Sequence, residues 1–182
     1  MGRLKNTIVY QVGSIDQSKD YGVGWRKKIK PFLKKFGILV IDPTDKPING
    51  YNERHENVKL NKKLIYEERY DEATHILKQI RAIDLRFCDN CSFAIFYLDL
   101  TIRTFGSIEE ISWINRMRKP ILVVIEQTKK RSPGWLLAII PHQFIFNNFT
   151  EMKNYLKYID DEHNELIEPH KSRWVFFDHT KL

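Results

Sequence analysis

Strand-length apolar runs alternate with helical patterns along this chain, and this alternation constrains the fold more than any other feature. Continuous apolar runs at residues 38–43 (ILVIDP) and 120–125 (PILVVI) are typical of strands buried on both faces of a parallel sheet. Strands that alternate with helices form such a sheet, with helices covering both of its faces. A length of 182 residues suits one such α/β domain, and we expect residues 1–182 to form it.

The predicted elements follow from periodicity and from turn residues. Strands are expected at residues 7–12, 38–43, 92–98, 120–125 and 143–146. Helices are expected at residues 22–36, over a stretch that ends near Asp89, from Ser107 onward, and at 150–158 with Thr150 as the N-cap. Pro31 should kink or restart the first of these helices. The polar residues 44–61 are interpreted as a long loop at the edge of the sheet.

Composition excludes several classes of protein. The chain is 42% hydrophobic and 29% charged, and no apolar run approaches the length that crosses a bilayer. The first residues lack the apolar segment of a secretory signal, so a cytoplasmic location without membrane contact is expected. The net charge of +7 comes from lysines spread along the chain. This distribution favours a solvated surface over nucleic-acid binding, although it would also attract a phosphorylated small molecule.

The two cysteines, Cys88 and Cys91, form a single CxxC motif. A zinc site needs four ligands, and the sequence offers no second CxxC or HxxxH motif to complete one. We therefore expect two reduced, half-buried thiols, no metal and no cofactor.

Ligands of open α/β sheets bind beyond the carboxyl ends of the strands. The residues expected there are Gly13, Ser14 and Asp16 after the first strand, Asp42 after the second, and residues 99–107 after the third. The familiar dinucleotide, P-loop, nucleophile-elbow and zincin motifs are absent. The candidate site is therefore built from carboxylates and hydroxyls.

Four side chains stand out in that setting: Tyr10, Asp84, Asp99 and Glu110. Paired carboxylates are the usual equipment of glycosyl chemistry, in which one group attacks the anomeric carbon and the other handles the proton of the leaving group. Each residue also has a structural interpretation. Tyr10 could pack in the core, Asp84 could face solvent, and Glu110 could form a capping box with Ser107.

Three segments, VYQVGSI (9–15), AIDLRF (82–87) and FGSIEEI (105–111), are followed by KPILVVI. In this order they resemble the nucleoside 2-deoxyribosyltransferase family and the related deoxynucleoside monophosphate N-glycosidases. The resemblance covers most of residues 7–125. It implies a flavodoxin-like (Rossmann-like) three-layer sandwich with a five-stranded, mainly parallel sheet. It also implies a retaining reaction in which a Glu attacks C1′ of a 2′-deoxynucleoside and the sugar then passes to another base or to water.

The resemblance assigns roles by position. Glu110 matches the nucleophile, Asp84 the acid that assists the departing base, and Tyr10 the tyrosine that hydrogen-bonds the nucleophile. Glu109 has no assigned role and is interpreted as a solvated acid. The remaining residues expected to bind substrate are Gly13, Ser14, Asp16, Asp99, Thr104, Gly106 and Ser107.

Departures from the family pattern leave the substrate open. Asp16 stands where the monophosphate-cleaving relatives carry a phosphate-binding Arg, which favours a nucleoside. Thr104 resembles the hydroxyl of the monophosphate enzymes, and Arg103 beside it could bind phosphate. The expected partners are thus a deoxynucleoside or deoxynucleotide, a free nucleobase, and further copies of the chain. The tail at residues 160–182 could complete a neighbour's site or pack on its own core, and a non-catalytic nucleotide-binding or nucleic-acid-binding module is the alternative to an enzyme.

Overall fold

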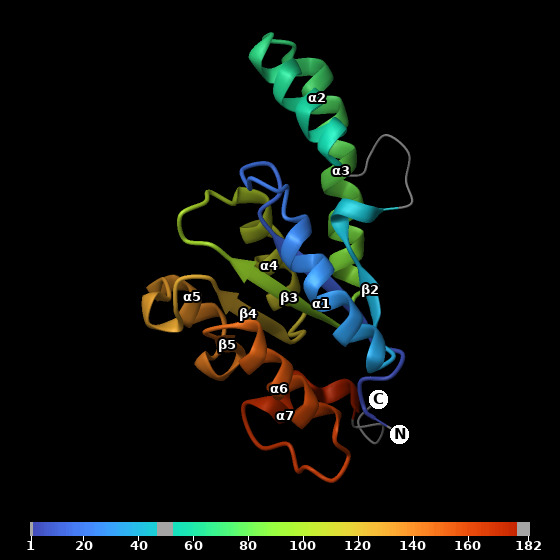
Figure 1. Ribbon diagram of the computed structural model, residues 1–182, viewed down its shortest axis with the longest axis vertical. Coiled ribbons are helices and arrows are strands. Elements are labelled where there is room, and N and C mark those ends of the chain that lie inside the picture. Colours follow the sequence, from blue (N-terminus) through green and yellow to red (C-terminus); the bar gives the residue numbers. More distant parts are fainter. Residues whose placement is uncertain (1, 47–52, 178–182) are drawn as a thin grey trace.

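A computed structural model describes residues 2–46 and 53–177 of the chain. Its centre is a five-stranded sheet in the order β2-β1-β3-β4-β5, with every pair of neighbours parallel (Figure 1). This is the strand order of flavodoxin-like folds, as predicted. The strands are β1 (Ile8–Gly13), β2 (Leu39–Ile41), β3 (Phe93–Leu98), β4 (Ile121–Ile125) and β5 (Ile145–Phe146).

Helices cover both faces of the sheet, which gives the three predicted layers. On one face α1 (Val23–Lys35) packs against β2, and α6 (Phe149–Asp160) packs against β4 and β5. On the other face lie α3 (Tyr70–Asn90) and α4 (Phe105–Arg116). Helix α2 (His55–Tyr66) packs on α3, and Figure 1 shows this pair projecting beyond the sheet. The shorter elements are α5 (Gly134–Ile139), α7 (His170–Arg173), η1 (Pro43–Asp45), η2 (Lys129–Arg131), η3 (His142–Phe144) and η4 (Val175–Phe177).

The second strand differs from its prediction. It spans only Leu39–Ile41, it pairs with β1 alone at the edge of the sheet, and Leu39 is 58% exposed. The apolar run correctly predicts a strand. It does not reveal how many neighbours the strand has, so the expected burial on both faces is wrong.

The predicted loop at residues 44–61 is also wrong in part. Residues 47–52 lie outside the described residues, but η1 precedes them and α2 begins at His55. The buried positions of α2 are Val58, Asn61 and Leu64, three residues apart with a polar side chain in the middle. That sparse pattern hides the helix from an analysis based on apolar periodicity.

Helix boundaries account for the remaining corrections. α1 continues through Pro31 without a restart, and Gly37 follows it with φ of 69°. Helix α4 begins at Phe105, so Ser107 lies inside it and is not the N-cap. Its buried face consists of Ser107, Ile111 and Ile114, whereas Ile108 is 50% exposed. The N-cap of α6 is Asn148, whose side chain accepts the Glu151 N–H, and not Thr150.

Two further features concern the core. Cys88 and Cys91 are both free and fully buried, which corrects the expectation of half-buried thiols. In the tail, Trp174 is buried against Phe93, with ring centroids 5.2 Å apart, so the described part of the tail packs on its own chain. Completion of a neighbouring subunit's site stays a prediction. Between residues 2 and 177, leaving out 47–52, no helix combines the length and hydropathy needed to cross a membrane.

Candidate active site

A cleft of about 550 Å³ lies where β1, α3 and α4 meet. The residues after β1 form one wall, the middle of α3 another, and the start of α4 a third. Most residues predicted from the sequence line this cleft: Gly13, Ser14, Asp16, Asp84, Thr104, Gly106, Ser107 and Glu110. The start of α4 faces open space at Gly106, since a Cβ atom placed there would meet no atom within 4 Å.

Glu110 is held by a tyrosine beneath the cleft. The Tyr10 hydroxyl donates a hydrogen bond of 2.6 Å to Oε1 of Glu110. Tyr10 is fully buried on the face of β1 that α3 and α4 cover, and it packs beside Phe87 of α3. Because α4 begins at Phe105, Glu110 is too far inside the helix to cap it. Its carboxyl is therefore directed at Tyr10 and the cleft, in the way a group that acts on a ligand would be.

Asp84 reaches the same place from α3 and has a partner that the sequence does not indicate. It is only 6% exposed, in line with Ile80 and Cys88 on the buried face of the helix. Its Oδ1 lies 2.6 Å from Nζ of Lys46, and the same Nζ lies 3.1 Å from Oε2 of Glu53. The interpretation of Asp84 as a solvent-facing acid is thus excluded.

Burial and mutual repulsion raise the pKa values of these carboxyl groups. Desolvation and the nearby Asp84 raise the pKa of Glu110 to about 8, although the Tyr10 hydrogen bond opposes this. Desolvation and Asp84 likewise raise the pKa of Glu53 to about 7. The pKa of Asp84 is raised by desolvation, while Lys46 opposes the shift. Near neutral pH, such a group contains both acids and bases.

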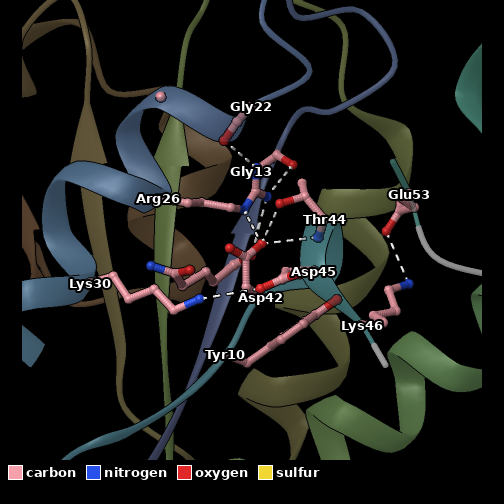
Figure 2. Close-up of polar contacts among 12 residues, drawn as sticks. Tyr10, Gly13, Gly22, Arg26, Lys30, Asp42, Thr44, Asp45, Lys46 and Glu53 are labelled. Carbon is pink, nitrogen blue, oxygen red and sulfur yellow. Dashed lines mark hydrogen bonds and ion pairs between the residues drawn. The ribbon is translucent and has the colours of Figure 1, made fainter. Parts of the chain in front are cut away.

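A buried arginine fixes the turn that follows β1. The Arg26 side chain is 0% exposed, and its guanidinium donates to the carbonyl oxygens of Gly13 and Gly22 (Figure 2). It also donates to the carbonyl oxygen of Gln11. Asp42 lies 3.7 Å from its Nε. Gly22 has φ of 69°, and a Cβ there would lie 2.2 Å from Nη1 of Arg26, so only glycine allows this packing. Arg26 thereby positions Gly13 and Ser14 at the cleft.

The mouth of the cleft carries charges of both signs. Arg81 of α3 and Glu109 of α4 form an ion pair across it, with Nε of Arg81 2.9 Å from Oε2 of Glu109. Glu109, interpreted from the sequence as a solvated acid, is thus partly exposed and paired. Asp16 is exposed at the mouth. Arg103 also lines it, and no carboxylate within the described residues pairs with its guanidinium.

Asp99 does not join the other predicted residues. Its Oδ1 accepts bonds from the backbone and hydroxyl of Thr101 and from Nε2 of Gln127, which stabilises the turn after β3. It lines a separate hollow of about 230 Å³. The structure therefore gives Asp99 a role in the turn.

Sequence reasoning missed Arg26 and Glu53, which line the cleft, and Lys46, which contacts the cleft residues Glu53 and Asp84. A lysine in a polar stretch and an arginine in a basic helix both have the pattern of surface residues. Only the contacts made on folding reveal their burial. In the described part of the chain, no cluster of three or more His, Cys, Asp or Glu side chains is arranged to hold a metal ion. The chemistry available is that of carboxyl groups, hydroxyls and buried cations.

Comparison with known proteins gives little beyond this geometry. No protein family and no curated protein matches the sequence. Among solved structures, the chain is similar to a CMP N-glycosidase of Clostridium botulinum, with 16% identity and a TM-score of 0.44, over 83% of this chain and 98% of the other. At that level of similarity, inferences about function have to come from the residues of the cleft itself.

Proposed function

We propose that this protein cleaves the N-glycosidic bond of 2′-deoxynucleosides through a covalent deoxyribosyl intermediate on Glu110 and transfers the sugar to another base. The observation that carries the proposal is the hydrogen bond between Tyr10 and Glu110 in a cleft that also contains Asp84. It supplies a nucleophile, a group that orients it, and an acid for the leaving base.

In the proposed reaction, a carboxylate oxygen of Glu110 attacks C1′. The bond from C1′ to the base nitrogen breaks, its electron pair stays on the base, and Asp84 gives that base a proton. An incoming base then attacks C1′ from the vacated side, loses its proton to Asp84, and releases the Glu110 carboxylate. Two successive displacements at one carbon retain the configuration of the sugar.

Hydrolysis of a deoxynucleoside 5′-monophosphate is the second candidate. The observation that favours it is Arg103 at the mouth of the cleft, where a guanidinium without a carboxylate partner among the described residues suits a phosphate. In that reaction water takes the place of the incoming base. The Asp16 carboxylate at the same mouth would repel a phosphate, which favours the nucleoside reaction.

The test is incubation of the protein with each deoxynucleoside, or its 5′-monophosphate, in the presence and absence of a different free base. Exchange of the base supports transfer, whereas base release from the monophosphate alone supports hydrolysis. Intact-protein mass spectrometry of briefly exposed enzyme should show one deoxyribosyl adduct, absent in Glu110→Gln. If no substrate gives exchange or release, the proposed function is wrong. Salt-sensitive DNA binding that Glu110→Ala leaves unchanged would then favour a non-catalytic binding module.

A further inference from the structure

Lys46 is a fully buried lysine whose charge faces two carboxyl groups. Its side chain is 0% exposed, compared with 8% for the Asp84 side chain and 23% for that of Glu53. An ammonium group is stable in such surroundings only when it is paired and hydrogen-bonded. Lys46 and Glu53 both belong to the segment between β2 and α2, and Figure 2 shows them beside Tyr10 of β1. Lys46 thus connects a partly exposed acid with a buried one.

The charges around Asp84 do not balance when every acid is ionised. Glu53, Asp84 and Glu110 supply three carboxyl groups, and Lys46 supplies one compensating charge at contact distance. Arg26 of α1 also acts on Glu53 and Glu110, but its guanidinium is engaged by Asp42 and by three carbonyl oxygens. The other titratable groups nearby are Tyr10 and Cys88, which are neutral at physiological pH. A proton is therefore retained within the group.

We infer that Lys46 and Glu53 are positioning residues that act on the leaving base through Asp84, with Lys46 fixing the Asp84 carboxyl and Glu53 replacing the proton that Asp84 gives away. This inference rests on the proposed function. It adds a residue pair from the segment between β2 and α2 to a site otherwise built from β1, α3 and α4.

The proton balance follows from the contacts. Asp84 transfers its proton to the departing base and becomes a carboxylate, which Lys46 stabilises through Oδ1. Glu53, whose carboxyl group contacts the same Lys46 ammonium as Asp84, passes its own proton to that carboxylate. When the incoming base gives its proton to Asp84, Asp84 returns a proton to the Glu53 carboxylate, so both acids regain their initial state at the end of the cycle. No oxidant, reductant or metal is needed.

The test compares Lys46→Met, Lys46→Arg and Glu53→Gln in the pH dependence of base release. Removing the cation raises the pKa values of the remaining acids, so both limbs of the profile in Lys46→Met should move to higher pH by about 1–3 pH units. Glu53 raises the pKa of Glu110, so in Glu53→Gln the acid limb, set by ionisation of Glu110, should move to lower pH by about one unit. Lys46→Arg should restore most of the original profile.

Lys63→Met is the matched control, since Lys63 lies on the outer surface of α2 with a side chain 67% exposed. Its profile should equal that of the wild type. A purely structural role for Lys46 predicts a lower rate with unchanged limbs, and that result would overturn the inference. Shifts of the same sign in Lys46→Met and Glu53→Gln would overturn it as well.

A readout without catalysis separates this inference from the proposed function. Carboxyl ¹³C NMR titration should show a higher pKa for Asp84 in Lys46→Met and a lower pKa for Glu110 in Glu53→Gln, in folded protein without substrate. If these shifts appear but the wild type releases no base, the proposed function fails and the link from Lys46 to Asp84 stands. If base is released and the titrations of Asp84 and Glu110 are the same in all variants, the inference fails and the proposed function stands.

Discussion

The Tyr10 hydroxyl donates a 2.6 Å hydrogen bond to Oε1 of Glu110, joining the middle of β1 to α4. Tyr10 is fully buried, so its hydroxyl has no access to bulk water, and Glu110 is its hydrogen-bond acceptor. This contact decides between the two interpretations of Glu110. A capping glutamate would lie at the start of its helix, whereas Glu110 lies inside α4 and is held at the cleft by Tyr10 of β1.

Replacing Tyr10 by Phe tests the contact directly. The hydrogen bond lowers the pKa of Glu110 against the effect of burial, so its loss should raise that pKa above about 8. The ionised nucleophile then becomes scarcer at neutral pH. We expect kcat/KM to fall about 10–100-fold, the equivalent of one hydrogen bond to a charged group, and the acid limb to move to higher pH. Base release measured against pH checks this, and an unchanged profile would contradict it.

Replacing Glu110 by Gln should change stability in a pH-dependent way. Its pKa is about 8 in the folded protein, above the ordinary value of 4.5. As pH rises between these values, the unfolded chain loses the proton that the folded chain keeps, so the wild type loses stability. Each unit of such a pKa difference is worth about 1.4 kcal/mol. We therefore expect Glu110→Gln to gain stability relative to the wild type between about pH 5 and about pH 9 in urea unfolding.

The neighbouring Glu109→Gln is the control for this measurement. The hydrogen bond from Arg81 lowers the pKa of Glu109, so its contribution to stability is present above the ordinary pKa and is lost only at lower pH. The difference in unfolding free energy between Glu109→Gln and the wild type should stay constant over the pH range in which that of Glu110→Gln grows. If the unfolding free energies of the two variants depended on pH in the same way, the pKa of Glu110 would not be raised in the folded protein, and the prediction would be wrong.

The sequence predicts the centre of this fold well and its edge poorly. Strands β1, β3 and β4 are mostly apolar and have a neighbour on each side, so their composition reflects their burial. At the edge, β2 has one neighbour, and α2 buries a polar Asn61 between two apolar residues. In β2 the apolar run overstates the burial, and in α2 the apolar periodicity is weak. Their positions depend on tertiary contacts that the pattern does not contain.

Some residues of the candidate site can be identified from the sequence and others cannot. Tyr10, Asp84 and Glu110 can be identified because they lie in recognisable segments at the ends or faces of regular elements. Lys46 and Arg26 cannot be identified from the sequence, because a buried lysine or arginine looks the same there as an exposed one. Only the contacts in the folded protein distinguish the two. Asp99 shows the opposite failure: its position after β3 suits a ligand, but its oxygen is used by Thr101 and Gln127.

Arg26 should contribute to stability far more than an ordinary arginine. Arg26→Met leaves the buried carbonyl oxygens of Gln11, Gly13 and Gly22 without these donors, together with the nearby Asp42 carboxylate. Breaking such a group of contacts costs about 3–5 kcal/mol. Urea unfolding measures this, with the exposed neighbour Lys27→Met as a control that should change stability by less than about 0.5 kcal/mol. Equal losses in the two variants would refute the role of Arg26.

Arg103 should distinguish a phosphorylated substrate from a nucleoside. It lines the mouth of the cleft, and no carboxylate within the described residues neutralises it. A charge-assisted hydrogen bond to a 5′-phosphate is worth about 1.5–3 kcal/mol, so Arg103→Met should raise KM for a monophosphate about tenfold or more while leaving KM for the nucleoside unchanged. Arg86→Met, which removes an exposed arginine of α3 that does not line the cleft, is the control and should alter neither value. An equal rise for both substrates would mean that Arg103 shapes the cleft without contacting a phosphate.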